Sequence, residues 1–416
     1  MSSRRYFLKS SGLAMASLGL EPLFLGRIAR GEPQKKGKIL ITIFQRGAAD
    51  GLNIVVPFAE KAYFDLRPTI AVPAPSSSRE QAALDLDGFF AFHPALEPLL
   101  PLYKSRHLAI VHAVGSPDNT RSHFDAQDYM ESATPGLKST RDGWLNRYLL
   151  TRSDAGATPF RAVSITAAMP RSLQGKAPAV AMGSIGEFDI RSGGDSDQAR
   201  RAFKGMYGST GSGMLGSVGQ ETFEAVEFLK KTNPAQYQPG EGVTYPRSPL
   251  GNSLKQIAQL IKSDVGLEVG FAETGGWDHH TNEGGVQGQL SQRLSDLSNS
   301  LAAFCRDMEG RLDDILILTM SEFGRTVREN GNRGTDHGHA NVMFVLGGSV
   351  KGGKVYGKWP GLAPEQLYEG RDLALTTDFR DVFGELLVQH LKLKAPAPVF
   401  PGYNLRPESF RGFLSA

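Results

Sequence analysis

Carboxylate and histidine side chains recur in the short polar segments that adjoin the most hydrophobic runs of this sequence. The candidate metal ligands are Asp50, Asp278, His280, Glu322, Asp336, His337 and His339. Asp278 and His280 are two positions apart, as are His337 and His339, so each pair can hold one ion from a single loop. Mixed carboxylate and imidazole ligands suit Zn²⁺, Mn²⁺ or iron, and carboxylates also bind Mg²⁺ or Ca²⁺. The residues therefore predict at least one divalent metal site and leave the identity of the metal open.

A hydroxyl group and three arginines accompany these ligands. Ser122 precedes a segment that favours a helix, and a hydroxyl beside a metal can act as a nucleophile, with Thr120 as the second candidate. The same hydroxyl is also a common helix N-cap without any chemistry. Arg46, Arg121 and Arg325 can bind phosphate or sulfate oxygens, or can pair with neighbouring carboxylates. We take Ser122 and these arginines as the candidate catalytic residues.

Six short runs of aliphatic and β-branched residues are typical of strands buried on both faces. They cover residues 38–44, 108–112, 162–165, 265–271, 315–318 and 342–346. An apolar stripe from Leu290 to Met308 predicts a helix between two of them. Strands that alternate with helices predict an α/β fold with a mostly parallel central sheet and helices on both faces.

In such sheets, ligands bind at the carboxyl ends of the strands. Polar segments with the candidate residues follow four of the predicted strands, and a fifth segment precedes strand 342–346. We therefore expect segments that are far apart in the sequence to meet at one edge of the sheet. This convergence is the main indication of function in the sequence.

The N-terminus predicts export by the twin-arginine pathway. Arg4 and Arg5 precede an apolar run over 12–20, which Glu21 interrupts before it reaches the ~20 residues that a membrane span needs. We interpret residues 1–31 as the signal segment. The expected location is periplasmic or extracellular, with the twin-arginine translocase as a partner during export and no transmembrane segment in the mature chain.

Composition argues against a nucleic-acid-binding protein and against a protein stabilised by intramolecular disulfides. Residues 1–31 have a net charge of +4 and the whole chain has +3, so the remainder is near −1 and carries no basic footprint for nucleic acid. Cys305 is the single cysteine, so intramolecular disulfides are excluded. A stretch rich in Gly, Ser and Pro at about 192–250 is expected to form an excursion over the surface.

Five motifs of the mature chain, together with the twin-arginine start, resemble the exported bacterial proteins of the domain of unknown function 1501 (DUF1501) family. They are FQRGAADGL (44–52), SHFDAQDYME (122–131), GGWDHH (275–280), SEFGRT (321–326) and TDHGHAN (335–341). The likeness covers nearly the whole mature chain in order. That family resembles the alkaline-phosphatase-like superfamily of sulfatases, phosphatases and phosphomutases, which implies a single α/β domain of this type over 32–416.

The resemblance also implies roles for individual residues. Asp50 matches the metal-binding Asp after the first strand, Ser122 the nucleophile, Asp278 with His280 an Asp-and-His element, and His337 or His339 the final His. Glu322 can replace the Asp of the late Asp-His pair, but Phe323 stands where the superfamily has a ligating His. A one-metal site and a two-metal site both remain open.

The predicted function is an exported metal-dependent hydrolase of phosphate or sulfate esters. In this hypothesis, a metal held by Asp50 and Glu322 activates Ser122 for attack on an anionic ester substrate. A second group, Asp278, His280 and His337 or His339, holds the leaving oxygen, and Arg46, Arg121 or Arg325 balances the developing charge. One alternative is an exported binding or assembly protein that keeps the fold without the reaction. A third is a metal oxidoreductase that uses the same loops with a redox-active ion.

Overall fold

A computed structural model describes residues 14–15, 37–76, 81–152, 158–187, 229 and 233–415. Its centre is a ten-stranded sheet. The strands are β1 (Ala14–Met15), β2 (Ile39–Gln45), β6 (Leu108–Gly115), β7 (Ala162–Ser164), β8 (Val180–Ala181), β9 (Val269–Thr274), β10 (Ile315–Met320), β11 (Asn341–Gly347), β12 (Val355–Tyr356) and β13 (Thr377–Asp378). Each of the six predicted strands corresponds to one of these, so that part of the prediction is confirmed.

The order of the strands is β1-β8-β7-β9-β2-β10-β11-β6-β12, with β13 beside β6. The strands β8, β7, β9, β2 and β10 are parallel to one another, whereas β11 is antiparallel to both of its neighbours, β10 and β6. The sheet is therefore mostly parallel, as predicted. Because β11 runs in the opposite direction, the segment that leads into β11 lies at the edge where the parallel strands end.

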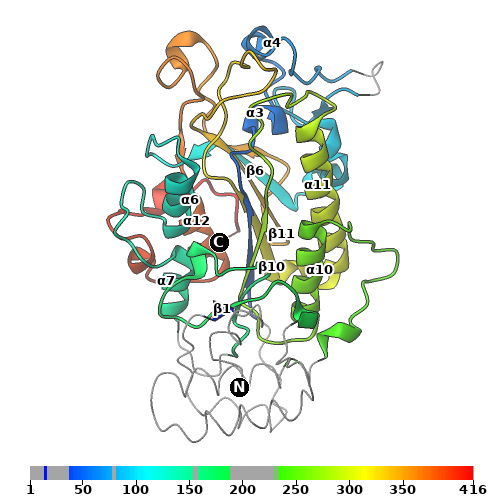
Figure 1. Cartoon of the computed structure of the whole chain (residues 1–416), viewed down its shortest axis with the longest axis vertical. Helices are drawn as coiled ribbons and strands as arrows, with labels where there is room; N and C mark the ends of the chain where they lie inside the picture. Colours follow the sequence, from blue (N-terminus) through cyan, green and yellow to red (C-terminus); the bar gives the residue numbers. More distant parts are fainter. Residues whose placement is uncertain are drawn as a thin grey trace, which may run out of the picture.

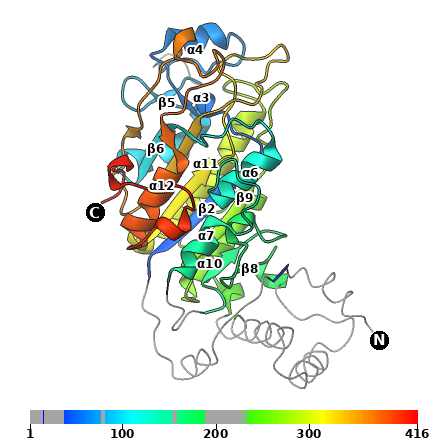
Figure 2. The same ribbon diagram turned by 90° about the vertical axis from the view of Figure 1, so that its left-hand side faces the viewer.

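Helices cover both faces of the sheet (Figures 1 and 2). On one face lie α10 (Pro249–Lys262) and α11 (Gln289–Asp307), and on the other lie α6 (His123–Ser132), α7 (Trp144–Leu150) and α12 (Phe379–Glu385). The alternation of side chains along β2 explains this arrangement, since Ile41 and Ile43 pack into the core on one face while Leu40 and Phe44 pack into the core on the other. The fold class is α/β with three layers.

The helix predicted from the stripe between Leu290 and Met308 is α11, and the residues of this stripe are buried against the sheet. Smaller elements surround the carboxyl edge of the sheet. They are α3 (Gly51–Ile54), α4 (Lys61–Leu66) and a three-stranded sheet of β3 (Val55–Val56), β5 (Ala91–Phe92) and β4 (Leu84–Asp85), whereas α5 (Leu100–Lys104) leads into the first residue of β6 at the opposite edge. Among the described residues, no helix combines the length and the apolarity that a bilayer crossing requires.

Two predicted segments lie largely outside the described residues. They are the signal segment 1–31, of which the structure describes the two residues of β1, and the excursion at about 192–250, of which residue 229 and residues from 233 onward are described. In that last part, a short turn precedes α10, whose N-cap is Ser248.

Candidate metal centre

Four side chains from three distant parts of the chain meet at the carboxyl edge of the sheet. His123 is the first residue of α6, Asp278 and His280 follow β9, and His337 precedes β11. The antiparallel direction of β11 is what brings His337 to this edge, because the chain must enter β11 where β2, β9 and β10 leave the sheet. The predicted convergence of separate loops is therefore observed for these residues.

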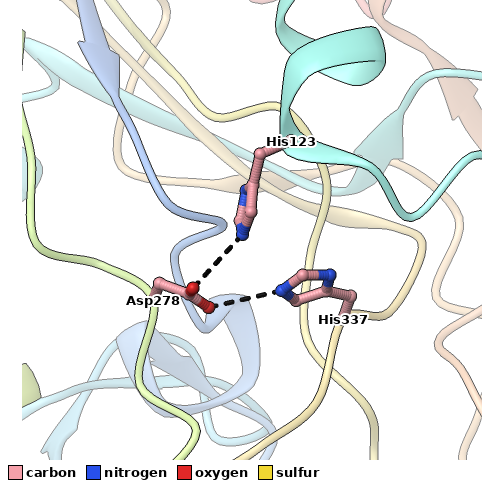
Figure 3. Close-up of side chains that lie close together, drawn as sticks. All are labelled: His123, Asp278 and His337. Atoms are coloured by element: carbon pink, nitrogen blue, oxygen red, sulfur yellow. Dashed lines mark hydrogen bonds and ion pairs between the residues drawn. The ribbon is translucent and has the colours of Figure 1, made fainter.

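The carboxylate of Asp278 lies at the middle of the group, and the rings of His123 and His337 point toward it (Figure 3). Its Oδ1 lies 3.0 Å from His280 Nε2 and 3.3 Å from His337 Nε2, and its Oδ2 lies 3.4 Å from His123 Nε2. One ligand atom each from His123, Asp278 and His337 lies within 4.8 Å of the other two. A single ion can therefore contact these three side chains, with His280 beside them.

Each of the three imidazoles is held at its other nitrogen by an oxygen acceptor. His123 Nδ1 lies 2.8 Å from Glu322 Oε1, His280 Nδ1 lies 3.1 Å from Asp336 Oδ1, and His337 Nδ1 lies 2.7 Å from the carbonyl oxygen of Arg121. Because an ionised carboxylate and a carbonyl only accept, each Nδ1 carries the hydrogen. The Nε2 lone pairs are then directed at Asp278, which is how protein histidines are oriented around a metal.

This arrangement leaves the inward-facing atoms without hydrogen. The Nε2 atoms of His280 and His337 are 3.0 Å apart, and neither is a donor in the tautomer that its Nδ1 contact fixes. The Nε2 of His123 is buried and has no hydrogen-bond partner among the described residues. A single proton can bridge only one pair of these lone-pair atoms. A divalent cation can accept lone pairs from three imidazoles and a carboxylate at the same time. The donor set fits a metal ion such as Zn²⁺, iron or Mn²⁺.

Arg325 keeps Asp278 ionised. Its Nη2 lies 2.6 Å from Asp278 Oδ1, and its remaining donors bind backbone carbonyls, including those of Ala48 and Thr335. Partial burial favours protonation of Asp278, but the hydrogen bond and the charge of Arg325 outweigh it and lower its pKa to about 2. Since Arg325 is buried and its donors are occupied, it orients and ionises a ligand instead of presenting a free guanidinium to a substrate.

Glu322 lies directly behind His123. It is fully buried, and its Oε1 accepts hydrogen bonds from His123, from Gln127 Nε2 at 2.8 Å and from the backbone N–H of Gly47 at 2.9 Å. Burial favours its protonation, but the bonds from His123 and Gln127 outweigh that and lower its pKa. In turn, the hydrogen bond to Glu322 raises the pKa of His123 and makes its imidazole a stronger base.

Phe323 directly follows Glu322, and its ring packs against two of the imidazoles. It stacks against His123 with 5.1 Å between ring centroids and lies 5.0 Å from the ring of His337. The phenyl ring restricts the orientation of both imidazoles from the apolar side.

Replacing Glu322 by glutamine is expected to weaken metal binding by about 10- to 100-fold, the usual effect of removing a carboxylate that supports a histidine ligand. Glutamine keeps the shape and one oxygen, so folding is expected to persist. Titration with Zn²⁺ against a competing chelator measures the change. Glu273→Gln is the control, because Glu273 pairs with Arg46 and not with a ligand. Equal affinities for Glu322→Gln and the unmodified chain would contradict this role of Glu322.

The structure places Asp50 in a separate buried network. Both of its carboxylate oxygens accept hydrogen bonds from Arg67, at 2.5 and 2.9 Å, and both side chains are almost fully buried. Burial opposes ionisation of Asp50, but the charge and hydrogen bonds of Arg67 outweigh it and lower its pKa. Burial and the neighbouring Asp50 charge raise the pKa of Glu283, whose Oε2 accepts a hydrogen bond from the Thr335 hydroxyl at 2.8 Å. Asp50 therefore braces the loop after β2 and does not face the four-residue group.

Ser122 is the N-cap of α6, and its hydroxyl accepts from the backbone N–H of Asp125 at 3.5 Å. It directly precedes His123 in the sequence. Its helix position agrees with both interpretations of the sequence, the cap and the nucleophile.

The remaining predicted residues surround the group without joining it. Asp336 supports His280 as described above. His339 is buried and stacks on Tyr368, with 4.4 Å between centroids. Arg46 pairs with Glu131 and Glu273, at 2.9 and 2.6 Å.

Arg121 pairs with Glu369 and Asp372, each at 2.8 Å, while its backbone carbonyl holds His337. Arg46 and Arg121 thus pair with neighbouring carboxylates. The sequence left open whether they do this or bind phosphate or sulfate oxygens.

His123 is missing from the ligand set that the sequence predicted, although it is a histidine that follows a polar loop after a strand. The available signal was its place at the first turn of a helix, beside Ser122 and one turn before Gln127, which also binds Glu322. Arg67 and Glu283 were also missed, because nothing in their local sequence distinguishes buried charged residues from exposed ones.

Comparisons with known proteins give a family and a likeness to solved structures. Among curated proteins, none matches this sequence. The chain is similar to the crystal structure of PsFucS1 sulfatase from Pseudoalteromonas sp., with a TM-score of 0.42, 11% sequence identity, and coverage of 95% of this chain and 76% of that chain. The family model described as "Protein of unknown function (DUF1501)" matches residues 106–399, which is more than half of the 416 residues. The family predicted from the sequence motifs is thereby confirmed, and the chain belongs to the DUF1501 family.

Proposed function

We propose that this protein is an exported, metal-dependent hydrolase of phosphate or sulfate esters, with one ion bound by His123, Asp278, His280 and His337. The observation that carries the proposal is the convergence of three Nε2 atoms on one carboxylate, each imidazole being fixed at Nδ1 by an oxygen acceptor. The twin-arginine start supports export to the periplasm or beyond.

A divalent ion held by His123, Asp278, His280 and His337 would supply Lewis acidity toward an ester oxygen and a hydroxyl group. The chain supplies the rest. Asp278 stays ionised because of Arg325, and Glu322 and Asp336 fix the orientation of two of the imidazoles. Asp50 is bound by Arg67, and Glu322 is bound by His123. We therefore propose a site for one ion, formed without these two carboxylates, in place of a two-metal site that includes them.

Ser122 is the proposed nucleophile, since its hydroxyl is adjacent in sequence to the ligand His123. Hydrolysis by Ser122→Asn is expected to fall by at least about 10³-fold, because the attacking oxygen is lost, while the fold is kept because asparagine is an equally good N-cap. Ser122→Ala is expected to lose the same activity and also about 1 kcal/mol of stability. Steady-state kinetics and urea unfolding of the two variants separate the nucleophile from the cap.

If Ser122→Asn hydrolyses esters at the rate of the unmodified chain, the serine is the cap alone and water is the nucleophile. The wider test is a panel of aryl phosphates and aryl sulfates given to the metal-loaded and the chelator-treated protein. Turnover that depends on the metal is expected for at least one series, and no turnover in either series would refute the hydrolase.

A further inference from the structure

A cavity of about 560 Å³ adjoins the metal centre on the side of α4. It lies between α4, the segment 326–336 and the turn at 362–371. Figure 1 shows α4 at the top of the molecule. Asp336 forms part of its wall and also holds His280 Nδ1 at 3.1 Å, so a single carboxylate separates the cavity from a proposed ligand. A substrate whose ester group lies at the metal can extend its other end into this space.

One part of the wall is apolar and comes from Leu66, Leu362, Pro364 and Leu367. The acidic groups in the rest of the wall are mostly occupied. Both oxygens of Glu329 accept hydrogen bonds from residues 69–70, and both oxygens of Asp65 bind Lys61. These acceptors are therefore not available to a ligand.

The donors of the wall are largely unoccupied. Arg328 is exposed and has no carboxylate partner among the described residues. The guanidinium of Arg371 donates one hydrogen bond among the described residues, of 3.3 Å to Asp372 Oδ2. The same oxygen also accepts a hydrogen bond from Arg121 at 2.8 Å. Two guanidinium groups thus offer planar donor pairs, which suit a carboxylate, sulfate or phosphate.

Asp336 supplies one further contact. Its Oδ1 accepts from Asn330 and His280, and its Oδ2 has no partner within the described part of the chain. An oxygen acceptor beside two arginines suits a ligand that donates a hydroxyl hydrogen as well as presenting an anionic group. Hydroxylated acids combine these features with an apolar face.

From this wall we infer that the cavity is the site for the non-transferred part of the substrate, and that this part is a hydroxylated organic group carrying a second anion. The inference rests on the proposed hydrolase for its place in the reaction. The binding of a hydroxylated acid to the cavity does not depend on turnover.

Direct binding tests the cavity without any reaction. Glucuronate and glucose differ in one carboxylate, and calorimetry is expected to show binding of glucuronate alone, weakened at least about 10-fold in Arg328→Gln and in Arg371→Gln, since a charged hydrogen-bond partner is lost. Lys394→Gln is the control, an exposed cation in a different depression. Equal binding of the two sugars, no binding of either, or unchanged affinity in both arginine variants overturns the inference.

Kinetics with matched esters link the cavity to catalysis. 4-Carboxyphenyl and 4-carbamoylphenyl esters of phosphate and sulfate differ in the charge of the leaving group, and kcat/KM is expected to be about 10-fold higher for the carboxylate, with the preference lost in Arg328→Gln and Arg371→Gln. Equal kcat/KM for the two leaving groups contradicts the inference and leaves the hydrolase intact. Absence of turnover with all four esters counts against the hydrolase, while glucuronate binding still decides on the cavity.

Discussion

Asp278→Asn is expected to remove the bound metal and to abolish hydrolysis. The carboxylate is the one anionic ligand, it lies within 3.4 Å of three imidazole Nε2 atoms, and its pKa of about 2 keeps it charged at neutral pH. Losing it is expected to cost more than the ~10–100-fold that follows the loss of a supporting group. Elemental analysis of the purified variant should show less than one-tenth of the metal content of the unmodified chain, and kcat/KM should fall at least as far.

Asp264→Asn is the matched control, because Asp264 is an exposed aspartate that pairs with Arg311 on the surface. It should keep both the metal and the activity. An Asp278→Asn protein that retained a full complement of metal would show that other residues hold the ion.

Arg67→Met is expected to lower the free energy of unfolding by about 3–5 kcal/mol, the usual cost of leaving one member of a buried ion pair without its partner. Arg67 and Asp50 are 0% and 1% exposed, and Arg67 also binds the carbonyl oxygens of Thr326 and Val327. Urea unfolding monitored by tryptophan fluorescence measures the loss. The pair joins the loop after β2 to the segment after β10, so the effect should extend to the metal centre.

The double variant Arg67→Met with Asp50→Asn is expected to recover part of that stability, because no charge is then buried alone. Arg328→Met is the control, since it replaces an exposed arginine without a carboxylate partner in the described residues. A change below about 1 kcal/mol in Arg67→Met would mean that water reaches Asp50 in the folded state.

The sheet and its edge could be predicted from the sequence because their signals are local. A strand such as β2 is a continuous β-branched run, and α11 carries an apolar stripe, so both are visible without tertiary information. The rule that loops meet at the carboxyl edge then brings Asp278, His280 and His337 together. The family prediction rested on several motifs that occur in a fixed order along the chain. The family model that matches residues 106–399 confirms it.

The roles within the site could not be predicted in this way. Whether Asp50 faces an ion or a buried arginine depends on Arg67, which is far from any motif and is placed by the turn after α4. Likewise, Glu322 and Asp336 are carboxylates of the same kind as Asp278, but hydrogen bonds to imidazole Nδ1 atoms make them supports instead of ligands. Spacing along the chain does not encode which atom of a side chain faces the centre.

The central claim is that His123, Asp278, His280 and His337 hold one divalent cation. X-ray diffraction from crystals of the purified protein, recorded on both sides of the absorption edges of zinc, iron and manganese, tests it most directly. One anomalous peak is expected at about 2.0–2.2 Å from the Nε2 atoms and from an oxygen of Asp278. Crystals in which the four side chains surround no anomalous scatterer after metal soaking, or in which the peak lies at Asp50, would contradict it.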